Sequence, residues 1–223
     1  KNSARWGVTF FAANTYEAVL VPILADFHPE SVNSLVDHSE SLVLLTDTDI
    51  WSKLDITKMP TIKAVISSSD FSLLYAADEK IQAANDNLDQ LFAAKYPKGF
   101  SAADVSYPTD NDKDLAIINY TSGTTSAPKG VMLRYECVSA NVAFGQKRLP
   151  SYPGDTIVSM LPMAHMYGMM FELIYPICNG AAVFYLGKTP TPALLLGAMK
   201  EVKPYLVITV PLVMEKIFKS KVA

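Results

Sequence analysis

The residues with the clearest chemical potential lie in the polar segment 120–131, which reads YTSGTTSAPKGV. Six of its twelve residues carry a hydroxyl, two are glycine and one is lysine. Backbone N–H groups in a glycine-containing turn can converge on an anion, while hydroxyls add donors and the lysine adds positive charge. A phosphate cradle is one interpretation of this segment, and a flexible polar hairpin loop is the other. The residue types alone leave both open.

The segment differs from the nucleotide-binding pattern GxxxxGK[ST]. Five residues after Gly123 comes Pro128, and Lys129 is followed by Gly130. The apolar run LAIIN precedes the segment and VML follows it, so the loop joins two strand-like stretches. Phosphate binding at the N-terminus of a helix is therefore not the mechanism that this pattern predicts.

Strand-like and helix-like segments alternate on both sides of the loop. Strands are predicted over residues 17–23, 41–46, 62–67, 115–121, 130–134, 155–161, 181–186 and 206–210. Helices are predicted over residues 28–40, 78–96, 136–149, 168–178, 192–202 and 211–221. This alternation predicts an α/β fold of layered βα units with mostly parallel sheets, whose ligands bind where strands end. The polar stretch 97–114 marks a boundary, so we expect one α/β subregion over residues 1–108 and a second over 109–223.

Composition excludes several classes of protein. The chain has 223 residues, with 19 basic against 22 acidic side chains, which gives no reason to expect nucleic acid as the main partner. Cys137 and Cys178 form no CxxC pattern, which favours a reducing cytoplasm over a disulfide scaffold. Pro162 and Glu172 interrupt the longest apolar tract, residues 160–187, so we expect no transmembrane segment. No signal peptide is visible, and the chain opens without Met in helix-like sequence, so we expect a piece of a longer protein.

The polar segment closely resembles the signature loop of the adenylate-forming superfamily, [YF]TSG[ST]TGxPKGV. Acyl-CoA synthetases, luciferases and the adenylation domains of peptide synthetases share this loop. Ser126 stands where the pattern has glycine, and serine strains the loop if that position needs a backbone conformation open only to glycine. A tolerated variant and a weakened site are both compatible with this departure.

The resemblance covers nearly the whole chain, in family order, and is weakest over residues 68–108. Residues 2–46 resemble the early part of the family domain, and residues 159–187 resemble its segment of a proline, a histidine, a helix and a Gly-Ala strand. Residues 202–221 resemble the stretch RPTxxxxVPRVxEKI, with Leu212 in place of the family arginine. Within the superfamily, the stretches MLPMAHMYG and VPLVMEKI point to long-chain fatty acid ligases.

The resemblance implies part of the N-terminal domain of an acyl-adenylate-forming enzyme. The family's YGxTE motif, its ribose-binding aspartate and its C-terminal domain with a catalytic lysine have no counterpart here, so we expect these 223 residues alone to be inactive. The implied enzyme is an ATP-dependent fatty acid–CoA ligase. A fatty acid carboxylate attacks the α-phosphorus of ATP, and coenzyme A then displaces AMP. ATP, fatty acid and coenzyme A are the implied substrates, Mg²⁺ the implied ion, and the location cytoplasmic, with peripheral membrane contact left open.

The resemblance also assigns roles to individual residues. Lys129 and His165 are the implied catalytic residues, and Thr121 is the implied ligand of Mg²⁺. The implied nucleotide-binding residues are Thr121, Ser122, Gly123, Thr124, Thr125, Ser126 and Lys129. The implied residues for binding the carboxylate substrate are His165, Tyr167, Gly168 and Met169.

Alternatives remain at two levels. His165 lies among methionines, and such a histidine is often a core residue satisfied by one hydrogen bond; the other interpretation is that it orients the substrate carboxylate. Met169 stands where some relatives place an aromatic gate, which puts such a gate in doubt. For the whole chain, the alternatives are a non-catalytic nucleotide- or acyl-binding module and an adenylate-forming enzyme for another carboxylate.

Overall fold

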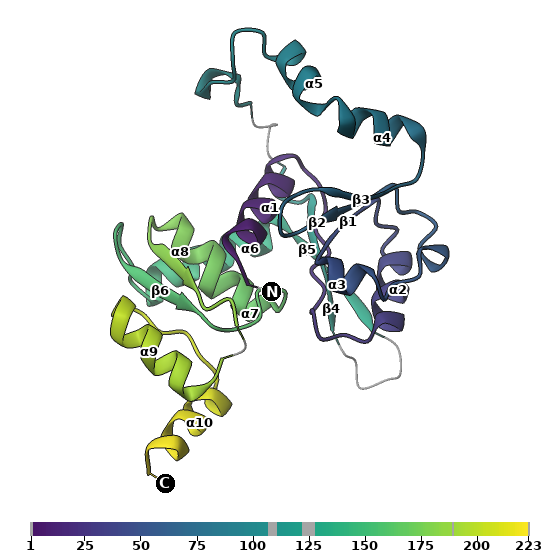
Figure 1. Ribbon diagram of the computed structural model, residues 1–223. Helices are drawn as coiled ribbons and strands as arrows, with labels where there is room; N and C mark the ends of the chain where they lie inside the picture. The colour runs from purple at the N-terminus through teal and green to yellow at the C-terminus, as the bar shows by residue number, and fades with distance from the viewer. Residues whose placement is uncertain (1, 107–110, 122–127, 189, 223) are drawn as a thin grey trace.

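The computed structural model describes residues 2–106, 111–121, 128–188 and 190–222, which form a layered α/β body with two helical projections (Figure 1). The first half contains α1 (Ala4–Thr15), α2 (Pro29–His38), β1 (Val43–Thr46), α3 (Thr48–Trp51), η1 (Ile56–Lys58), β2 (Ala64–Ser67), β3 (Leu73–Ala76), α4 (Glu79–Asp86), α5 (Leu88–Lys95) and η2 (Ala102–Asp104). The second half contains β4 (Leu115–Thr121), β5 (Lys129–Arg134), α6 (Tyr135–Arg148), β6 (Thr156–Ser159), α7 (Met166–Met169), the π-helical turn η3 (Met170–Ile174), α8 (Tyr175–Cys178), β7 (Ala182–Tyr185), α9 (Pro192–Val202) and α10 (Pro211–Val222).

The described strands form three small sheets. β1 pairs in parallel with β2, and β6 pairs in parallel with β7. Helices separate the strands of each parallel pair, as a parallel connection requires. β3 pairs antiparallel with β2, and β4 and β5 form an antiparallel hairpin. The predicted α/β class is confirmed, and each of the two antiparallel pairings joins strands that follow one another directly in the order of strands along the chain.

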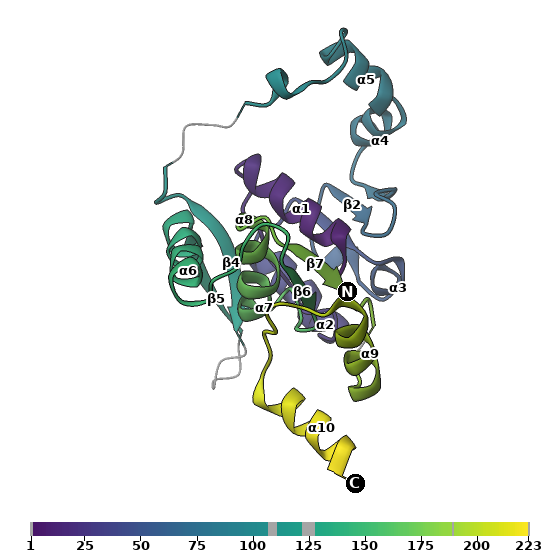
Figure 2. The same cartoon turned by 90° about the vertical axis from the view of Figure 1, so that its left-hand side faces the viewer.

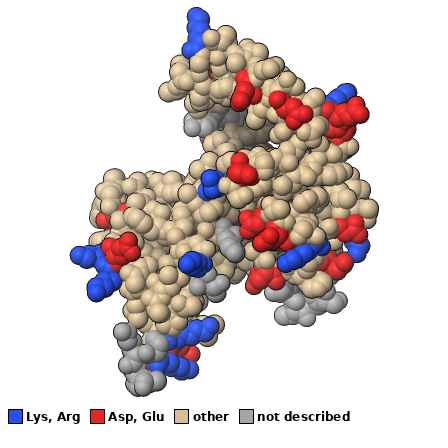
Figure 3. All heavy atoms as spheres, in the orientation of Figure 1, with Lys and Arg blue, Asp and Glu red and all other residues tan. Residues whose placement is uncertain are grey.

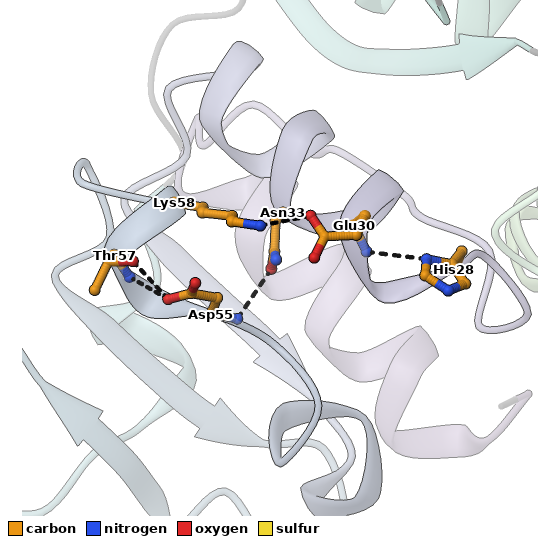
Figure 4. A network of polar contacts seen from close by, with 6 residues as sticks. All are labelled: His28, Glu30, Asn33, Asp55, Thr57 and Lys58. Carbon is orange, nitrogen blue, oxygen red and sulfur yellow. Dashed lines mark hydrogen bonds and ion pairs between the residues drawn. The ribbon is translucent and has the colours of Figure 1, made fainter.

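Polar contacts join α2 to η1 and to the residue before it (Figure 4). His28 caps the helix, because its Nδ1 accepts a hydrogen bond of 3.4 Å from the amide of Glu30. Lys58 of η1 forms an ion pair of 2.7 Å with Glu30, and the amide of Asp55 donates to Oδ1 of buried Asn33. Apolar side chains beneath these contacts make one core cluster, built around Val32, Val36, Met59, Ile62 and Val65.

The main core belongs to the second half but takes in α1. Phe10 of α1 packs against Ile117 of β4 and against Met169 and Leu173, all of them at most 3% exposed. Leu20 adds an isolated parallel bridge to Ile117. The first twenty residues therefore pack onto the hairpin β4–β5 and its neighbours. The division of the chain near residue 108 stays a prediction.

Three predicted elements differ from the structure. The strands expected over 17–23 and 206–210 are reduced to single bridges, at Leu20 and Leu206. Pro22 has no N–H to donate, which prevents a continuous ladder in the first of them. The helix expected over 78–96 breaks at Asn87, whose backbone leaves the helical region and whose side chain bonds the carbonyl of Ala83 at 2.8 Å. β3 is an additional strand that the sequence pattern did not predict.

The broken helix forms an arm that stands away from the body in both views (Figure 2). No residue of α4 or α5 is buried. The face drawn in Figure 3 carries interspersed acidic and basic groups within a mostly uncharged surface. Across the described ranges, the helices are too short or too polar for any of them to cross a bilayer.

Candidate functional site

The polar segment connects the two strands of the hairpin β4–β5. Thr121 ends β4 and lies in register with Lys129, the first residue of β5. Both side chains are exposed. The two ends of the loop are therefore held side by side by the backbone ladder, with a hydroxyl on one strand and an ammonium group on the other. The predicted nucleotide-binding residues between them, Ser122, Gly123, Thr124, Thr125 and Ser126, lie outside the described residues.

Buried side chains anchor β4 beneath the loop. Ala116 and Ile117 are fully buried in the main core. Tyr120 lies opposite Gly130, and a Cβ at Gly130 would sit 3.3 Å from the Tyr120 ring and 3.0 Å from Ile118. Glycine at this point of the motif therefore leaves room for the tyrosine ring across the hairpin.

Tyr120 also connects the loop to the first half of the chain. Its hydroxyl lies 2.7 Å from Nδ1 of His38, the last residue of α2, and the two rings meet edge to face. Burial raises the pKa of Tyr120, so the phenol keeps its proton at neutral pH. No local pattern in the sequence places His38 next to the loop strand, and this contact appears only in the folded chain.

His165 is exposed and caps the short helix α7. Its Nδ1 accepts a hydrogen bond of 3.2 Å from the amide of Tyr167. Accepting at Nδ1 requires that nitrogen to be unprotonated, so Nε2 carries the proton of the neutral ring. The interpretation of His165 as a core histidine is wrong, because its side chain is exposed. The ring instead presents Nε2–H as a donor on the surface.

The other predicted substrate residues differ in their surroundings. Tyr167 is 41% exposed, whereas Met169 is fully buried in the main core. Gly168 is buried, and a Cβ there would meet the carbonyl oxygen of Pro162 at 2.5 Å. This glycine lets α7 fold back onto the backbone just before His165. The substrate-binding roles of all three residues stay predictions.

Two polar side chains that the sequence did not single out hold the backbone before His165. Asn2 donates to the carbonyl of Leu161 at 2.6 Å and accepts from the amide of Met163 at 3.0 Å. Glu172 accepts from the amides of Met160 and Leu161 through Oε2, at 2.8 Å each. The sequence feature that could have predicted this role of Glu172 is the presence of a glutamate in the longest apolar tract, because a charged side chain is seldom buried without partners.

The same segment touches the hairpin. Nδ2 of Asn119, on β4, lies 3.5 Å from the carbonyl oxygen of Ala164, next to His165. Ile117 of β4 and Met169 of α7 belong to one core cluster. The structure therefore brings together the strand that leads to the polar loop and the segment that carries His165, which are more than forty residues apart in the chain.

Burial dominates the electrostatics of Glu172. It raises the pKa of this carboxyl from its ordinary 4.5 to about 7, against the opposing effect of the Leu161 and Met160 amides and the Ser159 hydroxyl. Glu172 is 0% exposed, and its Oε1 has no hydrogen-bond partner within the described part of the chain. The carboxyl group is therefore fully enclosed and bonded through one oxygen.

This arrangement has the fold of the N-terminal domain of adenylate-forming enzymes. It matches the inhibitor-bound N-terminal domain of FACL13 from Mycobacterium tuberculosis with a TM-score of 0.75, at 19% identity, over 97% of this chain and 49% of that one. It matches ATP-bound MatB from Rhodopseudomonas palustris with a TM-score of 0.73, at 17% identity, over 98% and 39%.

The chain belongs to the AMP-binding enzyme family, whose sequence model matches residues 1–223. It is 26% identical to long-chain-fatty-acid–CoA ligase 5 of Rattus norvegicus over 98% of this chain and 32% of the relative. It is 27% identical to the long-chain-fatty-acid–CoA ligase ACSBG2 of Homo sapiens over 97% and 32%. The chain thus spans about a third of the length of these curated relatives, and the resemblance seen in its motifs is confirmed at the level of the family.

Proposed function

We propose that the chain is part of an ATP-dependent fatty acid–CoA ligase and carries its pyrophosphate-facing loop and its carboxylate-orienting histidine. The observation that carries this proposal is the hairpin register. Thr121 and Lys129 stand side by side at the mouth of the family loop, on the paired strands β4 and β5, and β4 contacts the segment of His165. The names of the long-chain acyl relatives support the choice of a fatty acid as substrate.

In the proposed first step, a carboxylate oxygen of the fatty acid attacks the α-phosphorus of ATP. A new P–O bond forms, and the bond to the leaving pyrophosphate breaks. Negative charge then accumulates on pyrophosphate, and hydrogen-bond donors aimed at it, the proposed role of the Lys129 ammonium group and the loop hydroxyls, lower the barrier. The ATP-bound state of MatB, a protein of the same fold, supports ATP as the nucleotide.

We propose Thr121 as one protein ligand of a Mg²⁺ ion on the phosphates. Its exposed hydroxyl lies at the end of β4, and a hard oxygen is the kind of ligand that Mg²⁺ accepts. One protein oxygen is enough, because Mg²⁺ keeps several waters and takes further oxygens from phosphates. The ion would neutralise phosphate charge during the attack. O-succinylbenzoate coenzyme A synthetase from Bacillus subtilis, again of this fold with a TM-score of 0.72, is described in complex with ATP and magnesium ion.

His165 is proposed to hold the fatty acid carboxylate. Its Nδ1 is occupied by the amide of Tyr167, so Nε2–H remains to donate to one carboxylate oxygen. The second oxygen then faces the α-phosphorus as nucleophile. Holding a reactant in line in this way lowers the entropic part of the barrier.

The transfer to coenzyme A is proposed to use groups beyond this chain, which include the family's C-terminal domain.

The two subregions, divided near residue 108, remain a proposal for the organisation of this part. The cytoplasmic location also remains a prediction, since one Arabidopsis thaliana relative is named peroxisomal.

The test is pyrophosphate exchange by the full protein that carries this segment. We expect incorporation of labelled pyrophosphate into ATP that depends on palmitate, and palmitoyl-CoA formation after coenzyme A is added. The 223 residues alone should give no thioester. Binding of ATP or palmitate without exchange would contradict the proposal and favour a non-catalytic binding module.

A second carboxylate class deserves the same assay. The anthranilate CoA ligase AuaEII shares the fold with a TM-score of 0.74 at 17% identity. Anthranilate therefore serves as the aromatic competitor of palmitate. Exchange with anthranilate and none with fatty acids of any chain length would leave an adenylate-forming enzyme but reject the fatty acid.

A further inference from the structure

Glu172 is a buried titratable group to which the proposed chemistry assigns no role. It lies in the π-helical turn η3, seven residues after His165, and is 0% exposed. Oε2 accepts hydrogen bonds from the amides of Met160 and Leu161, whereas Oε1 has no hydrogen-bond partner within the described ranges. π-Helical turns occur mostly as single turns inserted into α-helices and frequently at functional sites. The contacts of the Glu172 carboxyl group therefore indicate its role.

A carboxyl group is a costly way to fill this position. The next two residues of η3, Leu173 and Ile174, are apolar and belong to the main core cluster. Burying an ionised carboxylate without a cation costs far more than burying an apolar side chain of the same size. General packing therefore does not explain a glutamate here, whereas its two short bonds to backbone amides do.

Those two amides lie where the chain leaves β6 and turns toward His165. β6 ends at Ser159, Met160 and Leu161 follow, and Pro162 accepts from the amide of His165 at 3.0 Å. Asn2 holds the same turn through the carbonyl of Leu161 and the amide of Met163. The backbone between β6 and α7 is thus clamped between Glu172 and Asn2, and His165 is the exposed side chain at its end.

We propose that Glu172 is a positioning residue for carboxylate activation, which fixes the path of residues 160–165 and so sets where the His165 ring meets the substrate. This inference rests on the proposed function of His165. Glu172 itself touches no substrate, and it acts through the backbone between β6 and α7.

The test is a double-mutant cycle in the full protein. Glu172→Leu, which removes the acceptor, should lower the rate of palmitate-dependent pyrophosphate exchange at least about tenfold with His165 present. In a His165→Ala background the same change should lower the residual rate less than about twofold, because the residue through which it acts is gone. The loss of thermal stability should be equal in the two backgrounds. Glu172→Gln, which keeps an oxygen acceptor, should retain more of the rate than Glu172→Leu.

Asn33→Leu is the matched control. Asn33 is also a buried polar side chain that accepts from a backbone amide, but it lies on α2, whose apolar residues Val32 and Val36 belong to a different core cluster (Figure 4). It should lower the melting temperature without lowering the exchange rate of the folded enzyme. If Glu172→Leu does not fold, Glu172→Asp replaces it, since the shorter side chain keeps the charge but does not reach both amides.

Amide hydrogen exchange gives a readout that does not depend on activity. Glu172→Leu should remove protection from the amides of Met160 and Leu161, and Asn33→Leu should leave it unchanged. Equal rate losses with and without His165, or unchanged protection at these amides, would overturn the positioning role. Absence of pyrophosphate exchange in the unmodified protein would instead reject the proposed function, and the inference with it.

Discussion

The hairpin end and the His165 segment carry the two halves of the proposed chemistry but are built in different ways. At the hairpin end, Thr121 and Lys129 are exposed and are placed by strand register. The His165 side chain is equally exposed, yet the backbone behind it is held by Asn2 and Glu172, which come from distant parts of the fold.

This difference in construction predicts that substitutions in the two regions affect reaction rate and stability differently. Removing an exposed side chain from a backbone ladder costs little packing, so a change at the hairpin end should alter rate alone. The backbone before His165 depends on buried polar contacts, and breaking one leaves amides or carbonyls without partners, at about 1–3 kcal/mol each. Changes behind His165 should therefore alter rate and stability together.

The largest expected effect is at the hairpin end. Lys129→Ala removes a charge aimed at the leaving pyrophosphate and should lower the exchange rate about 10²–10³-fold, with the melting temperature unchanged. Lys200→Ala, a change at an exposed lysine on α9, is the control and should leave the rate as it is. A normal exchange rate in Lys129→Ala would make the loop a structural hairpin.

The buried carboxyl group of Glu172 should make the free energy of unfolding depend on pH. The folded pKa of Glu172, about 7, exceeds its ordinary 4.5, so the folded state holds a proton that the unfolded chain releases between these values. The stability that this proton provides is present below pH 4.5 and is lost as the pH rises through 7, up to about 3 kcal/mol. Urea unfolding at several pH values should show this slope in the unmodified protein and not in Glu172→Gln. The Glu136→Gln change, at a half-buried glutamate paired with Arg134, should keep the slope, and an equal slope in Glu172→Gln would contradict the assignment.

Alanine substitutions at two glycines compare the tightly packed position Gly168, near His165, with the unobstructed position Gly197. Gly168→Ala places a Cβ 2.5 Å from the carbonyl oxygen of Pro162 and should destabilise the fold by about 1–3 kcal/mol. Gly197→Ala, on the exposed face of α9, meets nothing within 4 Å and should stabilise it by roughly 0.5–1 kcal/mol. Thermal unfolding of both variants measures the difference. Equal stabilities would mean that α7 shifts freely, against the clamped backbone described above.

His165→Gln tests the chemistry of the clamped segment. It keeps a donor but removes the ring, so the exchange rate should fall at least about tenfold, or 1.4 kcal/mol, with a small change in melting temperature. His28→Gln is a close control, because His28 also caps a helix through Nδ1 and is exposed. Preformed acyl-adenylate should bypass the defect. Thioester formation from it as slow as from free acid would contradict the carboxylate-orienting role of His165.

The smallest effect is expected at Ser126, which stands at the family glycine. Ser126→Gly restores the family residue, and the exchange rate should be equal or slightly higher. Steady-state kinetics with ATP as the varied substrate measures it. A loss of activity would mean that the serine hydroxyl contributes a contact of its own.

The sequence by itself determined the family, the α/β class and the strand–loop–strand character of the polar segment. Each of these follows from local order: the motif of residues 120–131 and the alternation of apolar runs along the chain. Local patterns also predicted α2, α6 and α9 to within about two residues at each end, because capping residues and apolar spacing lie inside the helix itself.

Only the tertiary structure decided what holds His165. Asn2 and Leu161 are 159 residues apart in the chain, and Glu172 reads in sequence only as an interruption of an apolar tract. Whether a polar side chain is buried, and which amides it meets, depends on how distant elements pack, and no local pattern encodes that. The same reason explains the unpredicted contact of His38 with Tyr120 and the exposed arm of α4 and α5, whose helical sequence could not reveal that the body would leave it uncovered.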